Sequence, residues 1–185
     1  DLMVMLYGME HFEVEGDLDR LNRLAQYLNV PGIDNTGPDT RIASTTALKH
    51  AYGFAASRYI TAEAQSFLSA HNKELLICLL CPTATDQVLR AQPRYDQPFA
   101  DHLHEEGFRV FDMNEVHRTD YRAFKLSVDE YRKRYWIGHY SPTGNHFFAY
   151  SLKDTVVEWL DPKPITYRGE AMSSADFTGY LPEPG

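Results

Sequence analysis

Three short, uninterrupted apolar runs constrain the fold of this chain more than any other feature of its sequence. They cover Leu2–Tyr7, Leu75–Leu80 and Phe108–Phe111, and the last of them ends at Asp112. Runs of this length without polar alternation are typical of strands that are buried on both faces of a parallel sheet. Because helical patterns separate the runs, the sequence predicts an α/β fold, a three-layer doubly wound parallel sheet with right-handed crossovers.

Three helical patterns lie between these runs. Residues Asp17–Leu28 carry one apolar stripe, with Asp17 as the N-cap. Residues Ser44–Ala70 are expected to be mostly helical, capped by Ser44 or Thr45. Residues Pro98–Glu106 form a shorter helix that stops at Gly107, a residue type favoured just beyond helix C-termini.

The clearest helix is the last one. Ser141 is its expected cap, Pro142 fits the first helical position, and the apolar stripe continues to about Leu160. We expect residues 1–164 to form one domain and residues 165–185 an extended C-terminal tail. Three strands are too few for so many helices, and the chain opens on a predicted core strand. The domain is therefore expected to lack its N-terminal strands.

Charge and composition exclude several partner classes. The chain has 18 basic and 26 acidic residues and a net charge of −8, which argues against nucleic acid or an anionic membrane as a partner. The cluster Arg132–Arg134 lies beside Asp129 and Glu130 and is interpreted as a solvated helix face. No apolar run approaches the roughly 20 residues that span a bilayer. The expected partner is a small molecule.

The cysteines and histidines do not predict a metal or redox site. Cys78 and Cys81 fall in one predicted strand and on opposite faces, so they are interpreted as small buried apolar residues rather than a disulfide. His102 and His104 are two residues apart on a predicted helix and face different directions, and His117 stands alone in the sequence. We expect neither a bound metal nor a cofactor.

Ligands of doubly wound sheets bind beyond the carboxyl ends of the strands. Three stretches are expected there: Gly8–His11, Cys81–Thr83, and a long loop from Asp112 to Pro142. The third contains the run WIGHYSPTGNHFFA, residues 136–149. This run resembles the block of SGNH/GDSL-type hydrolases that carries the catalytic histidine just before the last helix. The matching positions are His139, Ser141, Pro142, Gly144 and Ala149.

A second block, residues 1–11, resembles the strand and G-x-N-D turn of the same family. In that family the glycine amide and the asparagine side chain donate hydrogen bonds to the oxyanion. Gly8 matches the glycine, whereas Glu10 occupies the asparagine position and His11 the aspartate position. An ionised carboxylate cannot donate a hydrogen bond, so Glu10 could serve only if its pKa were strongly raised.

Two catalytic groups of the family have no match in the sequence. The acid that orients the histidine would stand where Trp136 or Ile137 stands, and Asp129 or Glu130 could instead reach the ring from the preceding segment. The nucleophilic serine of the family follows the first strand. The only similar turn, Gly16–Asp19, has no serine, so the nucleophile is expected upstream of Asp1.

The resemblance implies a serine-type hydrolase or acyltransferase that acts on an ester-linked acyl group. In this reading His139 is the general base and the Gly8 amide helps to hold the oxyanion, with Glu10 at the same subsite. A carbohydrate acyl ester would suit the aromatic-rich composition. The alternative is a non-catalytic SGNH-like domain that binds a sugar or a protein partner, because the orienting acid and the asparagine are missing.

Overall fold

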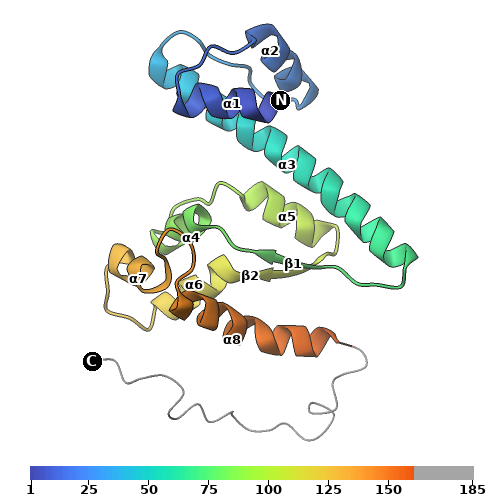
Figure 1. The fold of residues 1–185 in the computed structure, drawn as a ribbon, viewed down its shortest axis with the longest axis vertical. Helices are drawn as coiled ribbons and strands as arrows, with labels where there is room; N and C mark the ends of the chain where they lie inside the picture. Colours follow the sequence, from blue (N-terminus) through green and yellow to red (C-terminus); the bar gives the residue numbers. More distant parts are fainter. Residues whose placement is uncertain (161–185) are drawn as a thin grey trace, which may run out of the picture. The chain divides into compact units, whose positions relative to one another are not determined.

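The computed structural model describes residues 1–160, and these residues are mainly helical (Figure 1). Helices hold 66% of them. The chain divides into two compact units. Unit 1 comprises Asp1–Leu79 and Pro93–Val110, and unit 2 comprises Leu80–Gln92 and the chain from Phe111 onward. The domain boundary expected at residue 164 and the expected tail, residues 165–185, lie outside the described residues.

The predicted three-layer, doubly wound sheet is wrong. In the described part of the chain the sheet has two strands, β1 (Leu76–Leu79) and β2 (Arg109–Asp112), which are parallel. Both fall within the predicted runs to within a residue. The first predicted strand, Leu2–Tyr7, is instead the start of helix α1 (Leu2–His11). The described residues therefore form a two-stranded sheet in a mainly helical structure, in place of the larger sheet that was expected.

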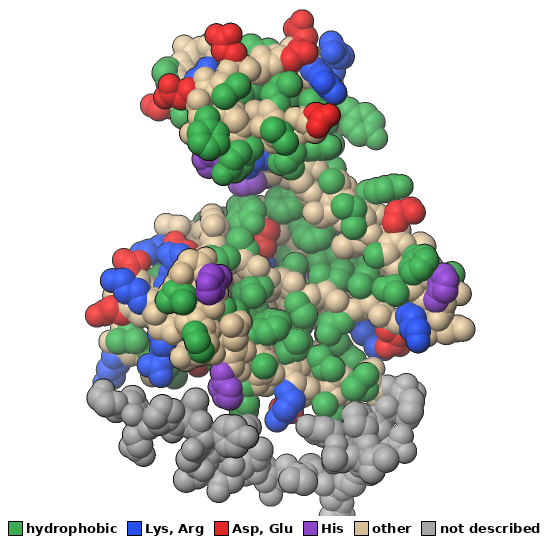
Figure 2. All heavy atoms as spheres, in the orientation of Figure 1, with side chains coloured by type: hydrophobic (Ala, Val, Ile, Leu, Met, Phe, Trp, Pro, Cys, Tyr) green, Lys and Arg blue, Asp and Glu red, His purple; other side chains and the backbone are tan. Residues whose placement is uncertain are grey.

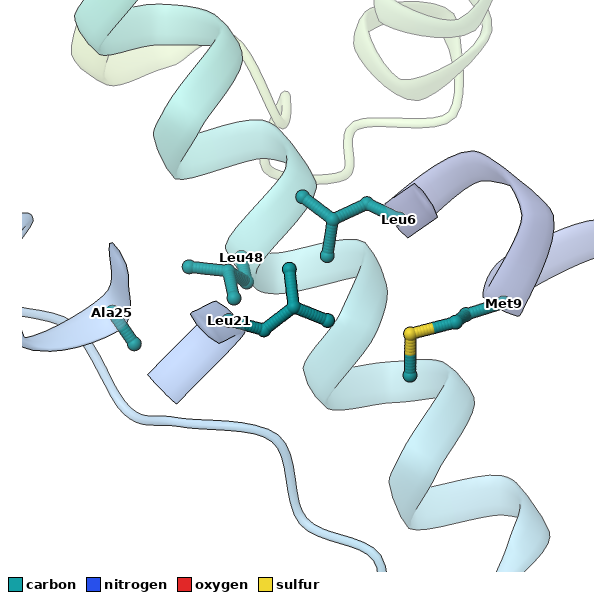
Figure 3. Packing of buried hydrophobic residues seen from close by; sticks show 5 residues of the cluster. All are labelled: Leu6, Met9, Leu21, Ala25 and Leu48. Atoms are coloured by element: carbon teal, nitrogen blue, oxygen red, sulfur yellow. The ribbon is translucent and has the colours of Figure 1, made fainter. Parts of the chain in front are cut away.

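Helix α1 exists because its apolar residues recur at helical spacing. Leu6 and Met9, three residues apart, are its buried residues. They join a core cluster with residues of α2 (Leu18–Tyr27) and α3 (Pro38–Ala70). Figure 3 shows Leu6, Leu21 and Leu48 directed toward one another from these three helices. A run that looked like a strand is therefore one face of a three-helix packing arrangement.

The predicted start of α2 is confirmed, but that of α3 is wrong. Asp17 caps α2 by accepting a hydrogen bond from the Arg20 amide at 2.9 Å. Helix α3 begins at Pro38 with Gly37 as its N-cap, ahead of the expected caps. Ser44 lies inside the helix, where its hydroxyl accepts a hydrogen bond from the Asp34 amide at 2.9 Å and ties down the preceding loop.

A second core in unit 1 lies between β1 and helix α5 (Gln97–Glu105). Leu79, Ala100, Leu103 and Phe108 form it. The predicted stop of α5 is confirmed, because Gly107 follows the helix with φ +73°. The prediction that both cysteines are buried is wrong, because Cys78 is exposed and Cys81 is half-buried; as expected, the two are not joined by a disulfide.

The described part of unit 2 contains four helices, α4 (Pro82–Leu89), α6 (Met113–Tyr121), α7 (Val128–Tyr135) and α8 (Pro142–Trp159). The long loop predicted from Asp112 to Pro142 is wrong, because α6 and α7 lie within it. Asp112 caps α6 through the Asn114 amide at 3.0 Å. Ser127 and Glu130 form a reciprocal capping box at the start of α7.

The predicted last helix is confirmed. Ser141 caps α8 by accepting a hydrogen bond from the Gly144 amide at 3.1 Å, and Pro142 occupies the first position. Gly144 is buried where α8 approaches α7 and the intervening loop. A Cβ at this residue would lie 2.4 Å from the Tyr135 carbonyl oxygen and 2.7 Å from Cδ1 of Tyr140. Gly144 thus permits a close approach of two chain segments.

Candidate active site

The candidate histidine lies in a tight turn between α7 and α8. An antiparallel bridge pairs Trp136 with Tyr140, and the Ile137 amide donates to the His139 carbonyl at 2.8 Å. Gly138 turns the chain with φ +95°, a conformation that side chains rarely adopt. His139 is exposed in this turn. The bridge and the two flanking helices therefore fix the backbone of His139.

The His139 ring is held by a backbone carbonyl. Its Nδ1 lies 2.8 Å from the carbonyl oxygen of Tyr140. A carbonyl only accepts hydrogen bonds, so Nδ1 carries the proton of the neutral ring and the Nε2 lone pair is free. This is the tautomer that a general base needs toward a hydroxyl group. In a catalytic triad a carboxylate fixes the same tautomer; here a carbonyl does so.

The two acids considered for that role are engaged elsewhere. Asp129 accepts a hydrogen bond from Nη2 of Arg90 at 2.5 Å. Glu130 accepts hydrogen bonds from the Ser127 hydroxyl at 2.6 Å and from the Ser127 amide at 2.8 Å, and these lower the pKa of its carboxyl group. Neither carboxylate is bonded to His139. The role of the missing acid, to hold the His139 ring through Nδ1, is therefore taken by the Tyr140 carbonyl.

Behind the turn, unit 2 contains a buried polar network. The fully buried ring of His117 has its Nε2 2.5 Å from the Tyr140 hydroxyl and its Nδ1 2.9 Å from the Tyr131 hydroxyl. The hydroxyls of Tyr131 and Tyr135 both donate to Oδ2 of Asp120, each at 2.9 Å. Helices α6 and α7 and the turn therefore contribute to one connected set of hydrogen bonds.

The protons of this network run in one direction. Burial lowers the pKa of His117 to about 4, so the ring is neutral and has one donor and one acceptor nitrogen. The Tyr131 proton points to the Asp120 carboxylate, which is closer and more strongly accepting than the His117 carbonyl at 3.3 Å. The Tyr131 oxygen therefore accepts from Nδ1 of His117, and Nε2 accepts from the Tyr140 hydroxyl.

Aromatic rings enclose the network. The ring centroids of Trp136, Tyr135 and Phe147 lie 4.5, 5.3 and 5.1 Å from that of His117. Burial, and then hydrogen bonding to Asp120, raises the pKa of Tyr135 to about 12 and that of Tyr131 still further. The phenols stay protonated as donors. This cluster was not predicted from the sequence, although Tyr131 and Tyr135, four residues apart in a segment that begins with a capping sequence, were a usable signal.

Gly8 and Glu10 belong to unit 1, whereas His139 belongs to unit 2. Gly8 lies inside α1, where a backbone N–H is used by the helix itself. Burial raises the pKa of Glu10, but hydrogen bonds from Lys49 and Thr46 and nearby positive charge lower it below its ordinary value. Glu10 is thus an ionised acceptor, paired with Lys49 and 2.6 Å from the Thr46 hydroxyl. Neither residue offers an oxyanion donor in this arrangement.

A hollow of about 280 Å³ lies next to the His139 turn. It is lined by Asp129, Arg132, Lys133, Trp136 and Gly138. Arg132 pairs with Asp86 at 2.8 Å, while Lys133 is exposed as the sequence predicts. Figure 2 shows Lys and Arg side chains gathered with acidic ones over α7. The hollow therefore has a mixed polar wall and one aromatic residue.

Residues 1–160 contain neither a cluster of metal-ligating side chains nor a helix that could span a membrane. No group of three or more His, Cys, Asp or Glu side chains there is placed to hold a metal ion. No helix in that range is long and apolar enough to cross a membrane.

Neither a protein-family model, nor a curated protein, nor a solved structure matches this chain.

Proposed function

We propose that this chain supplies the general base, His139, of an ester hydrolase or acyltransferase that works through a serine hydroxyl. The observation that carries the proposal is the hydrogen bond from Nδ1 of His139 to the Tyr140 carbonyl, which leaves the exposed Nε2 as a proton acceptor. The likeness of residues 139–149 to the SGNH histidine block supports the same role.

In the proposed reaction Nε2 of His139 accepts the proton of a serine hydroxyl as the oxygen attacks the acyl carbonyl carbon. The imidazolium then gives that proton to the departing alkoxide, and the acyl group remains on the serine until water or a second alcohol removes it. The Tyr140 carbonyl keeps the ring in one tautomer and stabilises the imidazolium. A carbonyl carries less charge than a carboxylate, so we expect a slower base than in a complete triad.

The attacking serine of this proposal lies outside residues 1–160. Within those residues His139 bonds to no serine hydroxyl. The proposed substrate is an ester-linked acyl group, and an acylated carbohydrate is the preferred class. The hollow beside Gly138 supports that preference, because an aromatic ring flanked by charged side chains suits a sugar.

The test measures hydrolysis of p-nitrophenyl acetate and of acetylated sugars. It uses the protein isolated from its own source, so that any sequence flanking residues 1–185 is present. His139→Ala should lower the rate by a factor of about 10³. The matched control is His71→Ala, because His71 is also exposed and its Nδ1 also bonds to a carbonyl, that of Phe67, at 2.7 Å. This control accounts for hydrolysis by any free imidazole.

Equal rates for the wild type and His139→Ala would refute the catalytic proposal. In that case the alternative, a non-catalytic domain that binds a sugar or a protein partner, would stand. The paired carboxylate of Glu10 and the helical position of Gly8 are the observations that favour it, because they leave the oxyanion without its expected donors.

A further inference from the structure

We infer that His117 and Tyr140 act as positioning residues that fix the tautomer and orientation of His139. The inference rests on the proposed function, which it deepens by assigning a role to the buried network behind the turn. His117 itself has no access to substrate, because its side chain is fully buried.

Tyr140 connects the two histidines through its two ends. Its hydroxyl donates to Nε2 of His117 at 2.5 Å, and its carbonyl accepts from Nδ1 of His139 at 2.8 Å. The direction of the carbonyl depends on the backbone of Tyr140, and anchoring the ring restricts that backbone. An anchored ring therefore restricts where the His139 imidazole can point.

The anchor is firm because each side chain of the network has a partner. His117 donates to Tyr131, Tyr131 donates to Asp120, and Tyr135 donates to the same carboxylate oxygen. A buried group that loses its partner pays the full cost of desolvation, so alternative positions of the Tyr140 ring are unfavourable. The ring is also flanked by Trp136, with ring centroids 4.9 Å apart.

A purely structural role would stabilise unit 2 without affecting His139. The two roles are separated by long-range ¹H–¹⁵N NMR correlations, which report the tautomer of each histidine. In the wild type we expect His139 to be mainly the Nδ1–H form. Tyr140→Phe removes only the hydroxyl, and it should shift His139 toward a mixture of both tautomers.

The matched control is Tyr121→Phe. Tyr121 lies in the same aromatic cluster and its hydroxyl also makes one hydrogen bond, to the Leu126 carbonyl at 2.8 Å, but it is not bonded to the network. This variant should leave the His139 tautomer unchanged. Asp120→Asn, at the far end of the network, should shift the tautomer in the same direction as Tyr140→Phe.

In the esterase assay Tyr140→Phe should lower kcat by about tenfold to a hundredfold with little change in KM, because the base is displaced while the hollow is intact. Unchanged His139 signals in folded Tyr140→Phe would overturn the inference. That failure is distinct from failure of the proposed function, which shows as His139→Ala without effect on the rate. A tautomer shift without any esterase activity would uphold the positioning and refute only the catalysis.

Discussion

The hydroxyl of Tyr140 lies 2.5 Å from Nε2 of His117, a contact between side chains 23 residues apart in the sequence. This bond uses the one lone pair of a neutral, buried imidazole. The carbonyl of the same tyrosine accepts a hydrogen bond from Nδ1 of the exposed His139. One tyrosine therefore separates a histidine that cannot meet solvent from one that can.

The buried His117 predicts a loss of stability at acid pH. Burial lowers the folded-state pKa to about 4 from an ordinary value of 6.5, so the unfolded chain binds the proton first. The stabilisation is complete above about pH 6.5 and is lost as the pH falls toward about 4, an effect of about 3 kcal/mol. Both tryptophans, Trp136 and Trp159, lie in unit 2. Tryptophan fluorescence during urea unfolding at each pH therefore measures the free energy of unfolding of this unit.

The control for this prediction is His102→Ala in helix α5 of unit 1, which should leave the pH dependence of the fluorescence transition unchanged. Burial and the Lys49 charge also lower the pKa of His50, but that residue belongs to unit 1 and should not move the tryptophan signal. A transition midpoint that is constant between about pH 6.5 and about 4 would contradict the buried, neutral state of His117.

The tyrosines of the network predict a second loss at alkaline pH. Burial and the hydrogen bond to Asp120 raise the pKa of Tyr135 from 10.0 to about 12. As the pH rises, this phenol therefore loses its proton in the unfolded chain before it does so in the folded one. Stability should therefore fall as the pH rises from about 10 through 12, and phenolate absorbance should increase in two stages. Asp120→Asn should bring the later stage closer to the earlier one. A single stage in the wild type would show that these phenols are solvated.

Helix caps and short strands were the features that could be predicted from the sequence. Asp17 and the Ser141–Pro142 pair specify helix starts through local hydrogen bonds and a fixed φ, and both starts are found. The run at Leu2 failed because a short apolar run has the same composition in a buried strand and in a buried helix. Only the partners of Leu6 and Met9, in α2 and α3, decide between them.

The candidate site was predictable only where it is local. His139 could be assigned to the segment just before the Ser141 cap, because the cap and the proline follow it directly. Its hydrogen bond to Tyr140 depends on the geometry of the turn, and the surroundings of His117 depend on the packing of α6 against residues of α7 and α8. The S-x-x-E sequence at Ser127 is a local signal for the start of a helix, and it was not used when this segment was predicted to be a loop.

Glu10 tests the assignment of the N-terminal block. Its carboxylate accepts hydrogen bonds from Thr46 and Lys49 across α1 and α3, so Glu10→Gln should destabilise unit 1 by about 1–2 kcal/mol. Amide hydrogen exchange in α1 measures this effect. Glu63→Gln, on an exposed part of α3, should change it little. If Glu10 instead blocked an oxyanion site, an uncharged residue there would raise esterase activity without loss of stability.

Gly144 gives the sharpest test of the turn that carries His139. In Gly144→Ala the new Cβ would lie 2.4 Å from the Tyr135 carbonyl oxygen, a backbone atom that cannot rotate away. Helix α8 must then move away from α7, and we expect a loss of about 1–3 kcal/mol in unit 2, measured by tryptophan fluorescence. Because Tyr140 Cδ1 is the next atom, at 2.7 Å, the His139 tautomer should change as well.

The matched control is Gly53→Ala in α3, where the nearest side-chain atom, Cε of Met3, lies 3.7 Å from the added Cβ. Alanine favours a helix interior over glycine by roughly 0.5–1 kcal/mol, so this variant should be neutral or slightly more stable. Equal tolerance at both glycines would mean that α8 does not approach the turn as closely as described. In that case the packing of α8 would no longer support a fixed position for the His139 turn.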